Sequence, residues 1–283
     1  MVGSVQVVSI SSLKGGVGKT SVTLGLASAA LSAGIPTLVV DLDPHADAST
    51  GLGVSLNRPE QEIGRQLKAA RKADLEASAV LSPWTQRAGQ GSGQNGPAPV
   101  LDVAVGGAFG SIYDRPDLRT RDLKRLKTLL DRTGRYKLVL IDCPPSLNGL
   151  TRMAWMASSR AILVAEPSLF SVAGTERTMR ALELFRNEFT SGPARAHVVA
   201  NRYRETSTEQ RFRLGEMRKM FADQLLTPVL PEQPDWQQIQ GAAYSVHQWP
   251  GEDARRTAGH FDELLRGVTG TVAARRPRQR ATV

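Results

Sequence analysis

Cysteine is nearly absent from this chain of 283 residues, because Cys143 is its one thiol. A single cysteine cannot form an intramolecular disulfide, and with four histidines beside it a cysteine-built metal site is also disfavoured. Long apolar runs are absent as well: stretches such as residues 161–165 have strand length, far below the ~20 residues that span a bilayer. The first residues lack the basic and apolar regions of a signal peptide. These absences favour the reducing cytoplasm.

Acidic side chains are in the minority. The 36 lysines and arginines outnumber 27 aspartates and glutamates, which gives a formal net charge of +9 and a sequence pI of about 10.1. This balance favours polyanions as partners, either nucleic acid or an anionic membrane surface. The composition is otherwise that of a globular protein, with 41% hydrophobic residues. The length allows two domains of ~150 residues or one large α/β domain with extensions.

Strand-like and helical segments alternate along the chain. Residues 5–10, 18–33 and 37–42 predict a strand, a helix and a second strand, which form a βαβ unit. Most later strand candidates are continuous apolar runs, as in parallel strands that are covered on both faces. The sequence therefore predicts an α/β protein with a doubly wound, mostly parallel sheet flanked by helices. The other predicted strands are 100–105, 137–141, 161–165 and 197–200, and the other predicted helices are 117–132, 147–157, 175–189, 209–221 and 253–265.

Two segments interrupt this alternation. Residues 88–99 are rich in glycine, proline and polar side chains, which predicts a flexible surface loop inside the domain. Residues 270–283 contain four arginines and no acid, which predicts a disordered basic tail. We therefore expect one domain over residues 1–269, followed by the tail.

The segment 12–21 reads SLKGGVGKTS and lies between the first predicted strand and helix. In that context backbone N–H groups and a helix N-terminus cradle phosphate. The P-loop pattern GxxxxGK[ST] would place glycine where Leu13 stands, but the glycine, lysine and threonine that end the pattern are present. The lysine would contact the β- and γ-phosphates, and the threonine hydroxyl would bind Mg²⁺. The predicted nucleotide-binding residues of this segment are Gly15, Gly16, Val17, Gly18, Lys19, Thr20 and Ser21.

Two later strands end in carboxylates. Asp41 and Asp43 are two residues apart, so both side chains point to one side at the carboxyl edge of the sheet, where ligands bind. Residues 137–145, KLVLIDCPP, are an apolar strand that ends at Asp142, which is typical of a Walker B strand whose carboxylate holds Mg²⁺ through water. Cys143 beside it is expected to be a small buried residue without a redox role.

Together these motifs resemble the deviant Walker A ATPases of the ParA/MinD/Soj family. The KGGVGKT form carries the resemblance, because Lys14 precedes its first two glycines, and DCPPS stands where the family has DTPPS. The resemblance covers residues 5–265. It implies a P-loop ATPase that uses Mg²⁺ to convert ATP to ADP and phosphate, in a homodimer that sandwiches the nucleotides.

The resemblance also implies roles for single residues. Lys14 would contact the partner subunit's nucleotide and stabilise the transferred charge, as an arginine finger does. Asp43 matches the carboxylate that orients the attacking water, and Asp41 matches its neighbour near the metal. The implied catalytic residues are Lys14, Lys19 and Asp43, and the implied metal-binding residues are Thr20, Asp41 and Asp142.

Of two further segments, one has a residue that the family also uses and the other departs from the family's pattern. Asn201 follows the predicted strand 197–200, where the family uses asparagine to read the adenine edge; a polar turn residue is an equal alternative. Residues 43–50 read DPHADAST and depart from the family's usual DPQGNAT. This departure bears on the expected rate of ATP hydrolysis, whereas the expected nucleotide binding does not depend on it.

A basic stretch lies where partition-type members of the family bind DNA without sequence preference. Phosphate contacts of that kind need only lysine and arginine, although a solvated helix face is an equal alternative. The C-terminal tail lacks the large apolar residues of a MinD-like membrane helix. The predicted DNA-binding residues are Arg202, Arg204, Arg211, Arg213, Arg218 and Lys219.

The resemblance therefore implies a ParA-like ATPase that dimerises on ATP and binds double-stranded DNA nonspecifically in chromosome or plasmid partitioning. A ParB-like or other adaptor protein would stimulate its hydrolysis. The protein would be cytoplasmic, without a membrane span, and associated with the nucleoid when ATP is bound. The alternatives are a MinD-like positioning ATPase at the membrane and a metabolic P-loop ligase of the cobyrinic-acid type, against which Lys14 argues.

Overall fold

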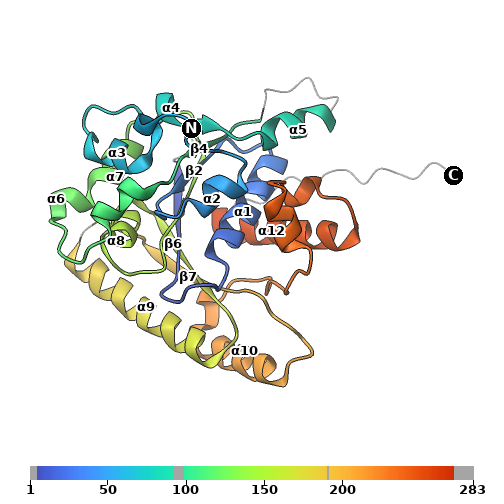
Figure 1. Ribbon diagram of the computed structural model, residues 1–283. Helices are drawn as coiled ribbons and strands as arrows, with labels where there is room; N and C mark the ends of the chain where they lie inside the picture. The colour runs from blue at the N-terminus through green and yellow to red at the C-terminus, as the bar shows by residue number, and fades with distance from the viewer. Residues whose placement is uncertain (1–4, 92–98, 190, 271–283) are drawn as a thin grey trace.

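The computed structural model describes residues 5–91, 99–189 and 191–270 and shows a central sheet with helices on both faces (Figure 1). The strands stand in the order β3-β4-β2-β5-β1-β6-β7. Neighbouring strands are parallel except for β3 and β4. This is the doubly wound, mostly parallel sheet that the sequence predicts. The strands are β1 (Gln6–Ser11), β2 (Thr37–Asp41), β3 (Val80–Leu81), β4 (Leu101–Ala104), β5 (Leu138–Asp142), β6 (Arg160–Ala165) and β7 (Arg195–Ala200).

Helices connect the strands, and α9 is the longest of those described; it runs along the outside of the molecule (Figure 1). The α-helices are α1 (Lys19–Ser32), α2 (Asp47–Gly51), α3 (Ile63–Lys68), α4 (Leu75–Ser78), α5 (Trp84–Gly91), α6 (Thr120–Leu123), α7 (Arg125–Leu130), α8 (Gly149–Ala157), α9 (Leu169–Glu188), α10 (Thr208–Phe221), α11 (Trp236–Gly241) and α12 (Glu252–Thr269). Short 3₁₀ helices occupy Pro59–Gln61, Ala108–Tyr113, Ala222–Gln224 and Val246–Gln248.

Each central strand is buried on both faces because alternate residues enter different cores. In β5, Leu138 and Leu140 pack in one core with side chains of α1 and α12. Val139 and Ile141 pack on the other face with side chains of α7 and α8. A strand covered in this way has apolar residues at successive positions, which explains the continuous apolar runs of the sequence.

The predicted strands and the larger helices are confirmed, with differences at the helices. The helix expected over 117–132 is divided into α6 and α7, which meet at Lys124. Helix α9 begins at Leu169, ahead of the expected start at residue 175. The edge strand β3 and the short helices α2 to α5 and α11 were not predicted, because elements of two to eight residues carry little periodicity.

The loop expected over residues 88–99 is wrong at its start, because α5 continues to Gly91. Trp84 anchors this helix: its side chain is buried, and its Nε1 donates to the carbonyl oxygen of Ala243 at 2.8 Å. Residues 92–98 of the expected loop and 271–283 of the expected basic tail lie outside the described residues.

Helix α12 closes over α1 at a point where only glycine fits. A Cβ atom on Gly25 of α1 would overlap the ring of Phe261, which is buried and stacks on Trp236 with ring centroids 5.6 Å apart. Gly259 of α12, in contrast, is exposed, and a Cβ there would point into open space among the described residues. The two glycines are therefore a test and a control for the close approach of these helices.

We expect Gly25→Ala to lower the free energy of unfolding by about 1–3 kcal/mol, because the added methyl group overpacks the core. Gly259→Ala should raise the free energy of unfolding by up to ~1 kcal/mol, since alanine is the better helix former. Urea denaturation of both variants measures the difference. A Gly25→Ala protein as stable as the parent would contradict the packing of α12 on α1.

Candidate functional site

Polar side chains gather at the carboxyl edge of the sheet, where four neighbouring strands end. The strands β2, β5, β1 and β6 are adjacent in the sheet. They lead into Asp43, Asp142, the loop 12–18 and Glu166 respectively. In doubly wound sheets ligands bind at this edge, where the connections diverge to opposite faces.

The loop 12–18 presents its backbone to an open side. Gly16 and Gly18 have φ angles of +77° and +90°, a left-handed conformation that other residues adopt only with strain. A Cβ on Gly15 or Gly16 would meet open space among the described residues. Gly18 precedes α1, whose first turn contains no acidic residue and, within the described chain, no side-chain cap. The N–H groups of that turn are therefore available to an anion, which the helix dipole also favours.

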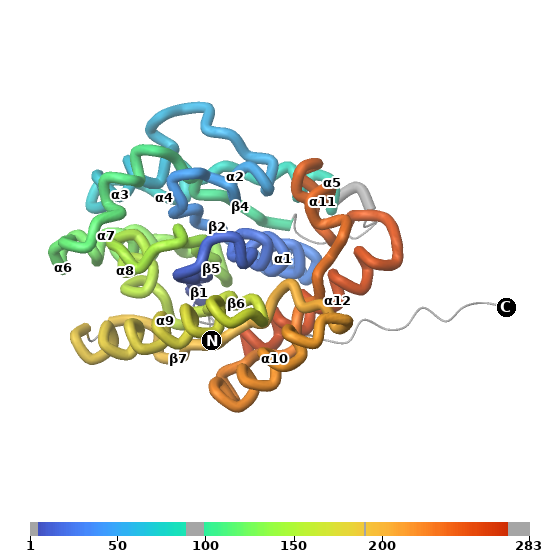
Figure 2. The backbone as a smooth tube through the Cα atoms, turned by 60° about the horizontal axis from the view of Figure 1, so that its bottom comes forward, coloured from blue at the N-terminus to red at the C-terminus, as the bar shows by residue number. Residues whose placement is uncertain are grey.

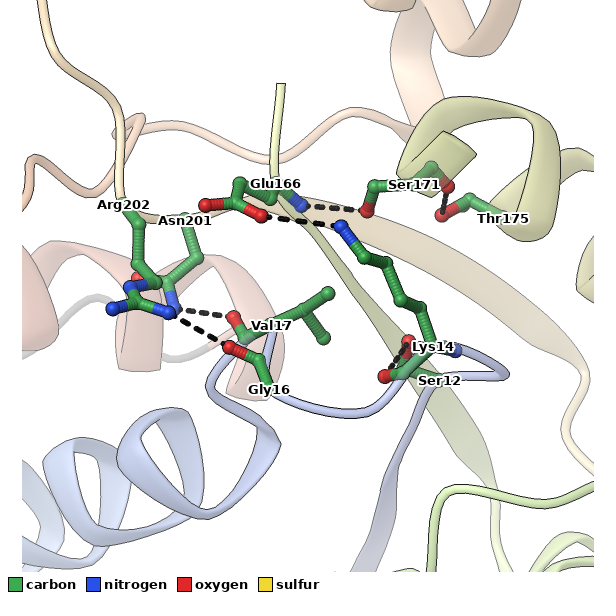
Figure 3. Close-up of polar contacts among 9 residues, drawn as sticks. All are labelled: Ser12, Lys14, Gly16, Val17, Glu166, Ser171, Thr175, Asn201 and Arg202. Atoms are coloured by element: carbon green, nitrogen blue, oxygen red, sulfur yellow. Dashed lines mark hydrogen bonds and ion pairs between the residues drawn. The ribbon is translucent and has the colours of Figure 1, made fainter. Parts of the chain in front are cut away.

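The two lysines of the loop differ in burial. Lys19, the first residue of α1, is only 7% exposed, whereas the Lys14 side chain is 41% exposed. The Nζ atom of Lys14 lies 3.4 Å from Oε2 of Glu166 in the same chain (Figure 3). Sequence reasoning missed Glu166, although it follows β6 directly, as Asp142 ends β5 at the same edge.

Asp142 joins the end of β5 to the first turns of α1. Thr20 Oγ1 donates to one carboxylate oxygen at 2.8 Å, and Thr23 Oγ1 donates to the other at 2.6 Å. Burial raises the pKa of Asp142, while the two threonine hydroxyls and the Lys19 charge act to lower it. Thr23 was also missed, although its i,i+3 spacing from Thr20 places both hydroxyls on one helix face.

Asp41 lies beside Asp142 on the neighbouring strand, but its oxygens are used within the protein. Oδ2 accepts from Ser49 N and Ser49 Oγ, both at 2.7 Å, and Oδ1 accepts from Asp43 N at 3.2 Å. Burial, and then the charge of Asp142, raise the pKa of Asp41. Asp43 is 8% exposed, and its Oδ1 accepts from His45 N at 3.0 Å.

The end of β7 is joined to the loop 12–18 (Figure 3). Asn201 Nδ2 donates to the carbonyl oxygen of Val17 at 2.8 Å, and Arg202 Nη1 donates to that of Gly16 at 2.8 Å. A Cβ on Gly18 would overlap the Asn201 amide, so these residues are in close contact. Arg202 has a left-handed φ of +57°. Its guanidinium thus contacts the loop, and Asn201 Oδ1 is the amide atom that could accept from an adenine amino group.

The other predicted DNA-binding residues do not form one cluster of unpaired cations. Arg213 lies between Glu209 and Glu216, with N–O distances of 2.7 Å to each. Arg204 lies 3.6 Å from Glu232. The three that remain are exposed and lie outside ion-pair distance of every carboxylate in the described chain: Arg211, Arg218 and Lys219.

The donor set at the end of β5 fits Mg²⁺. The Thr20 hydroxyl and the Asp142 carboxylate supply hard oxygen atoms, which Mg²⁺ takes together with water and phosphate oxygens. Of the residues described, no group of three or more His, Cys, Asp or Glu side chains is placed to hold a metal ion. Among the same residues, no helix is both long and apolar enough to cross a membrane.

Comparison with known proteins relates this chain to partition proteins and to a metabolic enzyme. The chromosome partitioning protein ParA of Caulobacter vibrioides is 28% identical over 234 residues, and the match covers 80% of each chain. The structure of a Cyanothece McdA variant in complex with ATP has a TM-score of 0.73 at 16% identity, covering 98% of this chain and 100% of that chain. Cobyrinic acid a,c-diamide synthase from Mycobacterium smegmatis with bound ADP and magnesium has a TM-score of 0.72 at 19% identity, covering 94% and 96%.

The two structural likenesses establish the fold. The family model of the CobQ/CobB/MinD/ParA nucleotide binding domain matches residues 8–241, a range that contains the loop, both carboxylate strands and Asn201. The chain therefore belongs to the CobQ/CobB/MinD/ParA nucleotide-binding family.

Proposed function

We propose that this chain is a ParA-like ATPase that forms a homodimer around two ATP molecules and hydrolyses them to ADP and phosphate. The observation that carries the proposal is the contrast between the two loop lysines. Lys19 is buried beside Asp142, as a residue that binds its own nucleotide must be. Lys14 stands on the exposed rim of the same loop, from which it could reach a second subunit.

Within one subunit each group has a distinct task. The N–H groups of the loop and of the first turn of α1, together with Lys19, bind the phosphates. Thr20 and Asp142 hold Mg²⁺, which neutralises charge on the β- and γ-phosphates when it is bound. Asp43 has one oxygen fixed by His45 N, and its other oxygen orients the attacking water. Asp41 holds the turn after β2 through Ser49, close to the metal-binding residues.

The proposed dimer completes the site, because Lys14 would stabilise charge on the phosphate transferred in the partner subunit. The name of the Caulobacter relative, a chromosome partitioning protein, supports a role in partitioning, of a chromosome or a plasmid. That role includes nonspecific binding to duplex DNA, nucleoid association in the ATP state, and an adaptor protein that stimulates hydrolysis. We take residues 1–269 as the unit that performs it.

Lys19→Ala should weaken ATP binding about 10- to 100-fold, because a charge-assisted contact to phosphate is worth ~1.5–3 kcal/mol. Isothermal titration calorimetry with ATP and Mg²⁺ measures the change. Lys137→Ala is the matched control, since Lys137 is exposed at the start of β5, away from the carboxyl edge. Equal ATP affinities for the two variants would contradict the assignment of the loop as a P-loop.

By itself Lys14→Ala should bind ATP but stay monomeric, because neither subunit then supplies the lysine, whereas Asp43→Ala should dimerise with ATP and hydrolyse it at least about 10²-fold more slowly. Light scattering with ATP, and then with ADP, reads the oligomeric state, and phosphate release reads turnover. A Lys14→Ala protein that dimerises and turns over like the parent would contradict the proposed mechanism.

Glu166→Gln should favour the dimer, because Lys14 must leave Glu166 before it can contact another nucleotide. The pair is partly exposed, so its loss is worth up to ~1 kcal/mol in each subunit. The dimer contains two such pairs, so its dissociation constant should fall by up to about 30-fold. Glu176→Gln is the control, since Glu176 pairs with Arg180 farther along α9. Sedimentation at several protein concentrations measures the dimer dissociation constants of the two variants. An unchanged or higher dissociation constant for Glu166→Gln would contradict this role of Glu166.

A further inference from the structure

A basic surface larger than that of α10 lies on the β4 side of the sheet, where α3, α6 and α7 are side by side (Figures 1 and 2). We call it the α3–α7 face and define it by residues 58–76 and 114–137. These two segments contain 14 lysines and arginines and eight aspartates and glutamates. Their net charge of +6 is two thirds of the chain's +9.

Many cations of the α3–α7 face have no acidic partner. Some are neutralised: Arg125 lies 2.7 Å from Asp122, and Lys127 lies 2.7 Å from Asp131. Eight others are exposed and, within the described chain, lie beyond ion-pair distance of any carboxylate. These are Arg58, Lys68, Arg71, Lys72, Arg119, Lys124, Arg132 and Lys137.

Two arginines join the segments of this face into one surface. Arg125 Nη1 donates to the carbonyl oxygens of Leu67 and Lys68 at 3.0 and 3.1 Å. Arg132 Nη1 donates to the carbonyl oxygen of Arg71 at 3.2 Å. Because these bonds fix α7 against the end of α3, cations from distant parts of the sequence lie on one rigid surface.

The side chains of the α3–α7 face are better suited to binding phosphate groups than to binding a protein. Protein interfaces centre on aromatic and apolar anchors, whereas phosphate contacts need only lysine and arginine. Of the large apolar side chains exposed in the described chain, none lies within the two segments of this face, and Leu56 and Ile112 each precede one of them by two residues. Helices α9 and α10, in contrast, expose Leu169, Phe170, Leu184, Phe212 and Met220.

We propose that the α3–α7 face is the principal contact of this chain with the phosphate backbone of duplex DNA. The proposal rests on the DNA binding included in the proposed function, and it assigns the main contact to α3, α6 and α7 instead of α10. Contacts to phosphate release condensed counterions, so each one contributes about −0.9 to the slope of log K against log salt.

The test compares two triple variants of the full chain that remove the same residue types. One is Arg71→Ala, Arg119→Ala and Lys124→Ala on the α3–α7 face. The control is Arg211→Ala, Arg218→Ala and Lys219→Ala on α10. A third protein ends after Thr269 and lacks the arginine tail. Each is titrated with ATP and Mg²⁺ against two unrelated duplexes by fluorescence anisotropy, between about 50 and 200 mM salt, with polyglutamate as a competitor.

We expect the α3–α7 variant to reduce the magnitude of the salt slope on both duplexes by about 2–3 for each face of the dimer that contacts the DNA, and the α10 variant to reduce it by less than about 1. The thermal midpoints of both variants should match the parent, since all six side chains are exposed.

The proposal is overturned if the α10 variant or the truncated protein reduces the salt slope as much as the α3–α7 variant does, or more. It is also overturned if the α3–α7 variant has the salt slope of the parent. In those cases DNA binding itself survives. If the parent binds neither duplex, the DNA-binding part of the proposed function fails as well. Binding of polyglutamate in place of DNA at this face would identify an acidic protein as the partner and would also overturn the proposal.

Discussion

The hydrogen bonds from Thr20 and Thr23 to the buried carboxylate of Asp142 fix the N-terminus of α1 against the end of β5. The glycine loop connects β1 to that helix end, so its conformation depends on the same attachment. Asn201 and Arg202 then fix the loop from the other side through its carbonyl oxygens. A buried acid left without these donors would cost about 1–3 kcal/mol or more. The attachment therefore supports both the fold and the anion site that we propose.

Sequence patterns predicted the parts of this molecule that depend on residues close together in the chain. The strands were recognisable because burial on both faces demands apolar residues throughout, and the loop was recognisable because its glycines and Lys19 are contiguous. The contacts of Glu166, Ser49 and Thr23 could not be read in this way, since each joins elements that are distant in sequence. Short helices such as α3 gave no periodic signal because they have too few residues to repeat a pattern. Their short length also makes them stable only when they pack against other elements.

Charge was the property for which sequence order was least informative. The stretch 202–219 looked basic along the chain, but the fold places Arg213 between two glutamates and Arg202 on the loop. A larger excess, of nine cations over four acids, lies in residues 114–137, and the fold adds the cations of residues 58–76 to it when α7 packs on α3. Fold likeness does not separate the functions either, because McdA and the cobyrinic acid enzyme have TM-scores of 0.73 and 0.72.

The central claim is that Lys14 acts on the nucleotide of the partner subunit, and mixing two inactive variants tests it most directly. A Lys14→Ala chain keeps Asp43 but lacks the lysine, and an Asp43→Ala chain keeps the lysine but lacks the carboxylate. In a mixed dimer that acts in trans, one site contains both groups. The account predicts ATP turnover by the mixture well above that of either variant alone. Turnover equal to the average of the two separate variants would contradict it.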